Sequence, residues 1–190
     1  MILAKCFFLG GAFKWGRLFL ILAVSSYGSS CAVTPHLNQL ESPRLIQQVP
    51  FFPQEAFQCG PASLASLLNY WGIPVTPEDI ALAIYSPSAK GTLTIDLILY
   101  AEKKGLKANN YKSSVKDIRD KIDSGFPLIV MVDYGFWMVK QNHFMVVLGY
   151  DNNVVVAHSG RERLKVISLK DFMKTWGRTK FWTLLITPQR

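Results

Sequence analysis

The sequence has few cysteines and few histidines, and this scarcity excludes several classes of protein. Its 190 residues include three cysteines and three histidines. A disulfide-rich scaffold needs a larger, even set of cysteines. A zinc site needs cysteines and histidines at short, repeated spacings, which this chain does not contain. We therefore expect neither a metal site nor any other cofactor.

Runs of like charge are also missing. The formal net charge is +8, but the densest basic segments, 103–104 and 161–163, are short and separate. Nucleic-acid-binding proteins gather basic side chains into patches and interleave them with aromatic residues. Because this sequence does neither, we expect a mildly basic, solvated surface and no nucleic-acid partner.

The first 30 residues have the pattern of an export signal. They include three basic residues and no acidic one. An apolar run, LFLILAV, is followed by the small residues SSYGSS. A basic region, an apolar core and a following stretch of small residues are typical of a cleaved signal peptide. The apolar core is shorter than the about 20 residues of a membrane span, although an uncleaved anchor stays open if the preceding residues are counted.

Cys31 stands directly after this segment. The triplet Ser29-Ser30-Cys31 resembles the box of bacterial lipoprotein signals, in which the cysteine becomes lipidated, although Gly28 replaces the usual branched aliphatic residue. The following polar residues, 31–48, are typical of a tether. We expect an exported, membrane-anchored protein on the periplasmic or cell-surface side, with a folded domain over 49–190. Plain secretion is the alternative.

Apolar periodicity predicts the elements of this domain. Leu64, Leu67, Leu68 and Trp71 recur at helical spacing, and Gly72 suits the end of that helix. Further helices are expected from Thr76, over 94–104, over 114–124 and over 169–176. Strands are expected over 128–134, 143–150, 154–158, 163–168 and 181–187, and the second and third of these form a hairpin. Helices followed by antiparallel strands indicate the α+β class.

Cys59 lies at the start of the first predicted helix. The helix dipole and the free amides of the first turn lower the pKa of a thiol placed there. The same amides face the position where an oxyanion forms during acyl transfer. A single unpaired cysteine in an exported domain indicates a reactive thiol, and a buried small apolar residue is the alternative. His143, at the start of a distant strand, is the candidate base.

The segments VPFFPQEAFQCGPASLASLLNYWG and NHFMVVLGYD resemble the bacteriocin-processing cysteine peptidases, peptidase family thirty-nine, and their stand-alone relatives. The resemblance covers roughly residues 49–189. It implies a papain-like fold whose N-terminal helical half carries the nucleophile at a helix N-terminus and packs on an antiparallel sheet. It implies that Cys59 is the nucleophile, that His143 is the general base and that Gln54 donates to the oxyanion, with Gln58 as the rival donor.

The third catalytic position departs from the family pattern. The family usually has an aspartate on the strand after the Gly-Tyr-Asp turn, and this chain has VAHSG there. We expect His158 to orient the ring of His143. A two- or four-residue turn would place His158 on the sheet face of His143, whereas a three-residue turn would place Ser159 there. Asp151 is a further candidate, although its position is typical of a turn residue.

These features predict a membrane-tethered cysteine peptidase that acts on a peptide or protein substrate. The alternative is a weak or inactive peptide-binding lipoprotein of the same fold, because an imidazole does not stabilise an imidazolium as a carboxylate does. Transfer of the acyl group to an amine also stays open. Phe136 and Trp137 either wall a substrate groove or anchor their loop, and the segment 86–91 is expected to border the same cleft.

Overall fold

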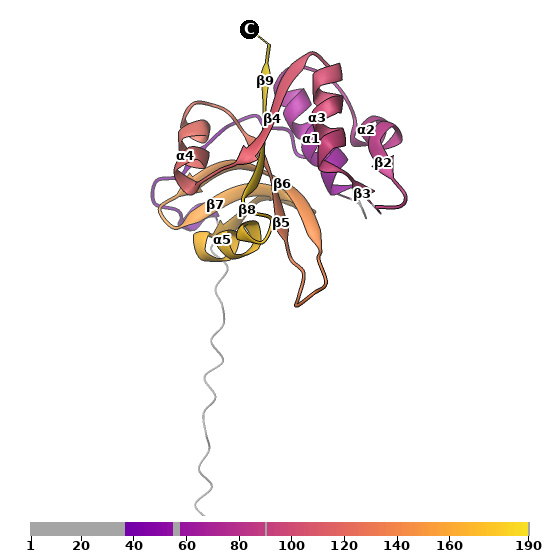
Figure 1. Cartoon of the computed structure of the whole chain (residues 1–190). Coiled ribbons are helices and arrows are strands. Elements are labelled where there is room, and N and C mark those ends of the chain that lie inside the picture. Colours follow the sequence, from indigo (N-terminus) through magenta and orange to yellow (C-terminus); the bar gives the residue numbers. More distant parts are fainter. Residues whose placement is uncertain (1–36, 55–57, 90, 190) are drawn as a thin grey trace, which may run out of the picture. The chain divides into compact units, whose positions relative to one another are not determined.

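The computed structural model describes residues 37–54, 58–89 and 91–189 (Figure 1). The predicted signal and Cys31 lie outside these residues. Val33–Arg190 forms one compact unit by itself, and both hydrophobic cores and every described strand belong to it. Among the described residues, no helix is long and apolar enough to cross a membrane.

All five predicted helices are present. Their bounds are Cys59–Tyr70 (α1), Pro77–Ile84 (α2), Thr94–Lys103 (α3), Val115–Asp123 (α4) and Leu169–Gly177 (α5). Gly60 through Leu68 are all buried, so α1 is enclosed on every side and needs no polar face. Three of the shorter helices, α2, α4 and α5, begin at a side-chain cap, and Thr76 and Asp79 form a reciprocal capping box at α2.

The main sheet has seven antiparallel strands among the described residues. Its order is Leu106–Lys112 (β4), Trp182–Pro188 (β9), Leu128–Asp133 (β5), Asn142–Asp151 (β6), Val154–Ser159 (β7) and Glu162–Ser168 (β8), with Arg44–Leu45 (β1) added beside β6. A separate hairpin joins Tyr85–Ser86 (β2) to Gly91–Thr92 (β3), and Leu37–Gln39 forms a short 3-10 helix. The five predicted strands and the β6–β7 hairpin are confirmed.

Four strands, β1 to β4, are absent from the sequence-based prediction. β4 is largely exposed and polar, so it lacks the apolar pattern of a strand, yet it pairs with β9 over its whole length. β1 lies within the range predicted as a tether. Its continuation Ile46 donates its N–H to the Leu148 carbonyl at 2.8 Å, so residues 44–46 are part of the folded body.

The sheet carries helices on both faces (Figure 1). One core combines α1, α2 and α3 with Phe144, Val146 and Leu148 of β6. The other combines α4 and α5 with Met145 and Val147 of the same strand. Alternate residues of β6 therefore serve opposite cores, and the helix that carries Cys59 packs on the antiparallel sheet as predicted for this α+β, papain-like fold.

A β-bulge interrupts the pairing of β6 with β7. Val147 pairs with Ala157 and Gly149 pairs with Val156, which leaves Leu148 as the extra residue. Gly149 is required here because a Cβ would come within 2.8 Å of the Arg44 carbonyl oxygen in β1. A shift of one residue exchanges the two faces of a strand. The bulge therefore decides which β7 side chain shares a face with the start of β6.

Candidate active site

Cys59 is the first residue of α1 and is half-buried. Burial raises the pKa of its thiol, although the backbone N–H groups of Phe144, Gly60 and Cys59 itself favour the thiolate. The predicted lowering of the thiol pKa is therefore wrong, because desolvation outweighs the amides. Phe144 directly follows His143 in β6, so the sulfur lies beside the start of the strand that carries His143.

The imidazole ring of His143 forms a hydrogen bond with Ser159 through Nε2. Its Nε2 lies 3.1 Å from the Ser159 hydroxyl oxygen, and its ring packs 5.6 Å from the ring of Tyr134. Burial, assisted by the positive charge of Lys165, lowers the pKa of His143 to about 4. The imidazole is thus neutral at physiological pH. When its Nε2–H donates to Ser159, Nδ1 keeps the lone pair that a general base needs.

The structure places His158 away from this ring. The turn after β6 contains only Asn152 and Asn153, and a two-residue turn alone would bring His158 to the face of His143. The extra residue Leu148 shifts the pairing of β6 with β7 by one residue, so Ser159 and not His158 lies on the sheet face of His143. The expectation that His158 orients His143 is not met, and the reason is the bulge.

His158 is instead a core residue with both ring nitrogens bonded. It is 3% exposed. Its Nε2–H donates to the Val49 carbonyl at 3.1 Å, and its Nδ1 accepts the Leu164 N–H at 3.2 Å. Burial lowers its pKa and keeps it neutral. The ring therefore ties the segment before α1 to β8.

Replacing His158 by alanine should destabilise the fold without impairing chemistry. The loss of two buried hydrogen bonds and of the ring volume should lower the free energy of unfolding by about 2–4 kcal/mol, measured by urea denaturation. The kcat of the folded protein should change by less than about twofold. A stable variant with a large loss of kcat would assign His158 to the reaction after all.

Asp151 also lies outside the site. Its carboxylate accepts the N–H groups of Asn152 at 2.7 Å and of Glu41 at 2.9 Å. These bonds lower the pKa of the carboxyl and fix the turn after β6. Asp151 is therefore a turn residue, the alternative that its sequence position favours.

Buried polar atoms without a partner gather around the start of α1. The atoms without a partner in the described chain are Gln54 Oε1, Ser63 Oγ and Thr92 Oγ1. Gln54, 9% exposed, lies five residues before Cys59, and its N–H donates to the Gly160 carbonyl, next to Ser159, at 3.0 Å. Unpaired buried polar groups are costly unless a ligand supplies the partner. Gln58, the rival donor, is the N-cap residue of α1 and makes no side-chain cap bond.

The β2–β3 hairpin borders the same helix end. A Cβ on Gly60 would meet the Thr92 Cβ at 3.0 Å, so glycine permits β3 to lie directly against the first turn of α1. The paired residues Ser86 and Gly91 of this hairpin belong to the segment that was expected to border the cleft. Thr92 thereby brings a buried hydroxyl next to the residue that follows Cys59.

A comparison with models of protein families shows which family this chain belongs to. A model described as the Peptidase_C39 like family matches residues 46–183. The chain belongs to the Peptidase_C39 like family. Its fold and family are those of cysteine peptidases, as the resemblance implied. An uncharacterized protein of Methanothermobacter thermautotrophicus (strain Delta H) is 30% identical over 126 residues, which cover 66% of this chain and 81% of that protein.

Solved structures show the same C39 fold. The peptidase domain of Streptococcus ComA, a bi-functional ABC transporter involved in quorum sensing, is 25% identical, with a TM-score of 0.62 over 75% of this chain and 100% of that domain. A putative C39-like peptidase from Bacillus anthracis is 18% identical, with a TM-score of 0.67 over 78% and 99%. The double glycine motif protease of an AMS/PCAT transporter, in complex with its leader peptide, is 23% identical, with a TM-score of 0.61 over 77% and 96%.

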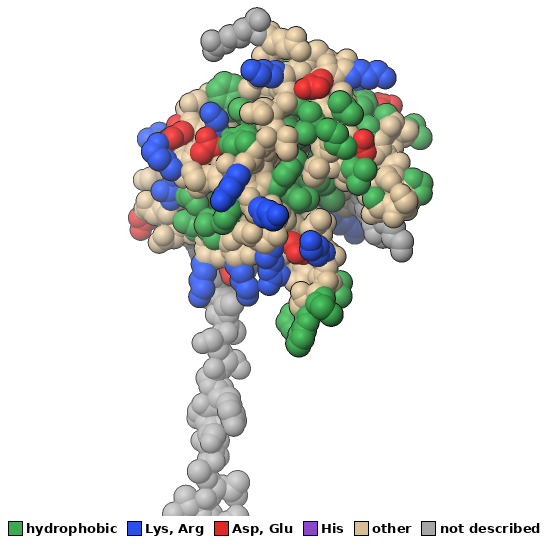
Figure 2. All heavy atoms as spheres, viewed as in Figure 1, with side chains coloured by type: hydrophobic (Ala, Val, Ile, Leu, Met, Phe, Trp, Pro, Cys, Tyr) green, Lys and Arg blue, Asp and Glu red, His purple; other side chains and the backbone are tan. Residues whose placement is uncertain are grey.

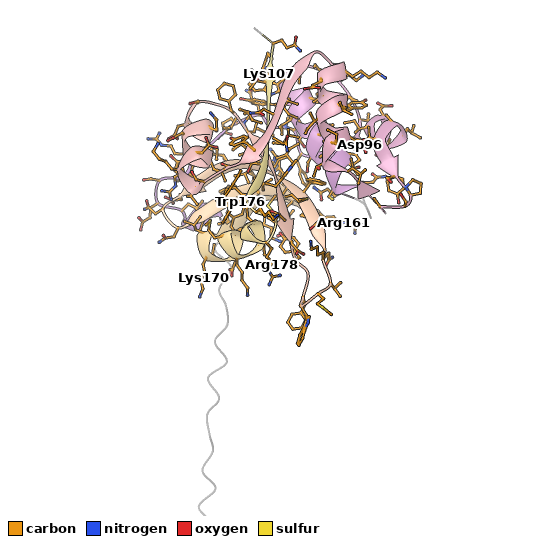
Figure 3. The ribbon with its side chains drawn as sticks, viewed as in Figure 1. Asp96, Lys107, Arg161, Lys170, Trp176 and Arg178 are labelled. Carbon is orange, nitrogen blue, oxygen red and sulfur yellow. The ribbon has the colours of Figure 1, made fainter. Side chains whose placement is uncertain are left out.

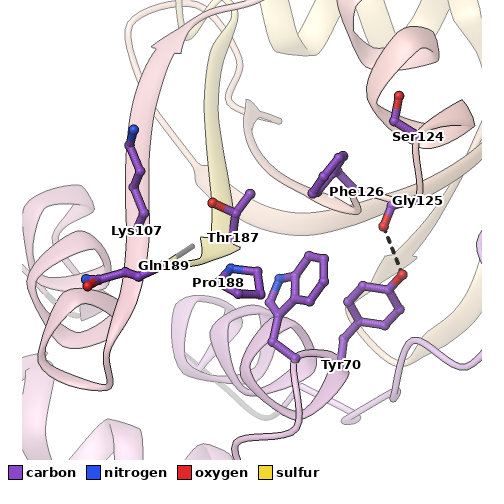
Figure 4. A pocket seen from close by; sticks show the side chains of 9 residues that line it. Tyr70, Lys107, Ser124, Gly125, Phe126, Thr187, Pro188 and Gln189 are labelled. Atoms are coloured by element: carbon purple, nitrogen blue, oxygen red, sulfur yellow. Dashed lines mark hydrogen bonds between the residues drawn. The ribbon is translucent and has the colours of Figure 1, made fainter.

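This C39-like chain also has a cavity that none of the predicted site residues lines. The cavity has a volume of about 900 Å³ and lies at the C-terminal end of α1, beside Tyr70 and Trp71 (Figure 4). The Tyr70 hydroxyl donates to the Gly125 carbonyl at 2.8 Å there. At about 1.5 Å per residue, α1 separates this cavity from Cys59 by roughly 16 Å.

Sequence reasoning missed part of the C39-like site. Tyr134 was placed only in a strand and Lys165 only in another strand, yet both lie near His143. The Ser159 hydroxyl also reaches the Tyr134 phenol. No local pattern in the sequence indicated that Thr92 lies near Cys59, because its position against Gly60 depends on a long-range contact. Ser159 was named in the sequence analysis as the alternative to His158, but the two-residue turn favours His158, and only the bulge in β6 brings Ser159 to the ring.

Proposed function

We propose that this chain is a cysteine peptidase that hydrolyses peptide bonds through Cys59 and His143, held at a membrane by its N-terminal segment. The observation that carries the proposal is the hydrogen bond between the Cys59 sulfur and the backbone N–H of Phe144. Phe144 directly follows His143, whose ring is neutral and whose Nε2 lies 3.1 Å from the Ser159 hydroxyl oxygen. Export and a lipid on Cys31 are supported by the pattern of residues 1–31.

In the proposed reaction, the Cys59 proton moves to Nδ1 of His143 as the sulfur attacks the scissile carbonyl carbon. The free amides at the start of α1 face the oxyanion, with Gln54 as a further donor. His143 then gives the proton to the departing amine, and a thioester remains on Cys59. Water, deprotonated by His143, cleaves the thioester and releases the acid product.

A peptide library tests this proposal directly. We expect mass spectrometry to detect defined cleavage products with the unmodified chain, and a peptidyl vinyl sulfone to add its mass to Cys59. Cys59→Ala should give neither result. The absence of cleavage together with retention of peptides by the unmodified chain would favour the second candidate function instead.

That second candidate is a peptide-binding protein with little turnover. Ser159 stands where a carboxylate would stabilise an imidazolium, and Lys165 adds a positive charge near the same ring. Both features oppose a thiolate–imidazolium pair. They favour either slow hydrolysis with a neutral base or binding alone.

The pH dependence of hydrolysis should reflect the low pKa of His143. A protonated imidazole cannot accept the thiol proton, and this pKa is about 4. We expect kcat/KM to stay level from about pH 7.5 down to about pH 5 and to fall near pH 4. Iodoacetamide should alkylate Cys59 slowly at neutral pH and faster above the ordinary thiol pKa, because burial raises the pKa of Cys59. A fall in kcat/KM near the ordinary histidine pKa would contradict this assignment.

A further inference from the structure

The turn between β5 and β6 forms a protruding apolar tip. Phe136, Trp137, Met138 and Val139 are 72–87% exposed. The hairpin extends beyond the body of the domain, and its end forms an apolar projection (Figures 1 and 2). These side chains therefore do not anchor their loop to the body. A contiguous exposed apolar group marks an interaction site.

The tip is held in one tight turn. The Val139 N–H donates to the Phe136 carbonyl at 3.1 Å. Trp137 has a φ of 55°, in the left-handed region that bulky residues rarely adopt. At the base, the Asp133 carboxylate accepts the Gly135 N–H at 2.8 Å. Strained conformations of this kind concentrate at functional sites, and here one presents an indole at the apex.

Basic side chains border the tip. Lys140 follows it in the chain. α5 carries Lys170 and Lys174, and Arg178 is its C-cap residue; the intervals of four residues place the three on one helix face. All four are exposed, and none is in an ion pair within the described residues. Figure 3 shows Lys170 and Arg178 at the edge of the domain from which the hairpin emerges.

The helix that carries these charges is fixed to the base of the tip. Arg178 donates to the carbonyl groups of Asp133 and Gly135. Thr179, just beyond α5, donates to the Met131 carbonyl of β5 at 2.6 Å. The acidic neighbour on α5, Asp171, accepts from the hydroxyl of its own capping residue, Ser168, at 2.6 Å. Hydrogen bonds therefore connect the end of α5, and with it the basic face, to the base of the apolar tip.

We propose that this surface docks on a membrane containing anionic lipid, with Phe136–Val139 inserted at the interface and α5 on the headgroups. An aromatic and aliphatic group bordered by lysine and arginine is the composition of interfacial membrane anchors. The basic face complements anionic headgroups, and a convex tip offers no cavity for a peptide. Tyr134, at the base of the turn, packs on His143, so docking holds the candidate active site at the bilayer surface.

This proposal goes beyond the peptidase function and needs no turnover. Its test uses residues 33–190, the compact unit that holds both cores, with Cys59→Ala. Vesicle sedimentation compares phosphatidylcholine with an equimolar mixture of phosphatidylcholine and phosphatidylglycerol. One variant replaces Phe136, Trp137 and Met138 by serine, and another combines Lys170→Glu with Lys174→Glu. The matched controls are Leu82→Ser, at an equally exposed apolar residue of α2, and Lys103→Glu with Lys104→Glu.

We expect tighter binding to the anionic vesicles than to the neutral ones. The tip variant should lose about tenfold or more in affinity, and the α5 variant should lose the preference for anionic lipid. Both controls should bind like the parent protein. Trp137→Phe should remove the blue shift of tryptophan emission that accompanies insertion.

Either of two binding results would overturn the proposal: the parent binds neither vesicle, or the tip variant binds as tightly as its parent. If that variant, with Cys59 restored, also raises KM for peptides in lipid-free solution, the tip is a substrate contact instead. A failure of the peptidase proposal appears separately, as the absence of cleavage by the chain with Cys59 intact.

Discussion

Replacing His143 by alanine should lower kcat/KM for peptide hydrolysis by about 10³-fold or more. Partial burial raises the pKa of the Cys59 thiol, so little thiolate exists at neutral pH without a proton acceptor. His143 is neutral and is oriented by Ser159. Removal of a positioned general base typically costs two to four orders of magnitude, and more when nucleophile and base act as a unit.

The two histidines provide a matched comparison. His143→Ala should leave the free energy of unfolding within about 1 kcal/mol of the parent value, whereas His158→Ala should lower stability and spare turnover. Cys59→Ala should abolish hydrolysis, and adding His143→Ala to it should cause no further loss. Retention by His143→Ala of more than about a tenth of the parental kcat/KM would exclude His143 as the base.

Replacing Ser159 by aspartate should raise kcat/KM for the proposed peptide hydrolysis by about 10- to 100-fold. The new carboxylate would lie behind Nε2 of His143, where the serine hydroxyl lies now at 3.1 Å. A negative charge there favours the imidazolium and raises the pKa of His143. Loss of an orienting carboxylate from a serine-type triad costs about 10⁴-fold in turnover, and a more nucleophilic thiol should depend on it less.

The negative charge of the aspartate, and not the shape of its side chain, should be responsible for the gain in kcat/KM. Ser159→Asn, which introduces a carboxamide of similar size, should raise kcat/KM much less than the aspartate. With the aspartate, the acid limb of the pH profile should move upward from about pH 4, because a higher pKa protonates His143 earlier as the pH falls. Alkylation of Cys59 at neutral pH should also become faster. An unchanged acid limb would show that residue 159 does not face His143 during the reaction.

The environment of Ser159 determines whether a carboxylate is tolerated. Ser159 is 5% exposed, and an unpaired charge at such a position is strongly destabilising. Here the His143 Nε2 and the Tyr134 phenol contact the Ser159 hydroxyl, and the charge of Lys165 acts on both of those rings. We therefore expect a loss of only about 1–2 kcal/mol in the free energy of unfolding.

Local signals in the sequence were sufficient for most of the fold. The leucines of α1 and its C-cap residue Trp71 recur at helical spacing. Thr76 and Asp79 form a cap within four residues, and β6 and β7 are apolar runs around an Asn-Asn turn. β4 was missed because an exposed strand at the sheet edge has no apolar pattern, and its identity comes from pairing with β9, about 75 residues later.

The sequence by itself determined the α+β class, the family and the positions of Cys59 and His143, because these depend on short motifs and on periodicity. Only the tertiary structure decided which side chain forms the hydrogen bond with Nε2 of His143. One extra residue, Leu148, reverses the faces of β6 against β7, so a serine meets the ring and a histidine enters the core. Burial likewise decided the direction of the pKa shifts of Cys59 and His143, since desolvation depends on neighbours that are distant in the chain.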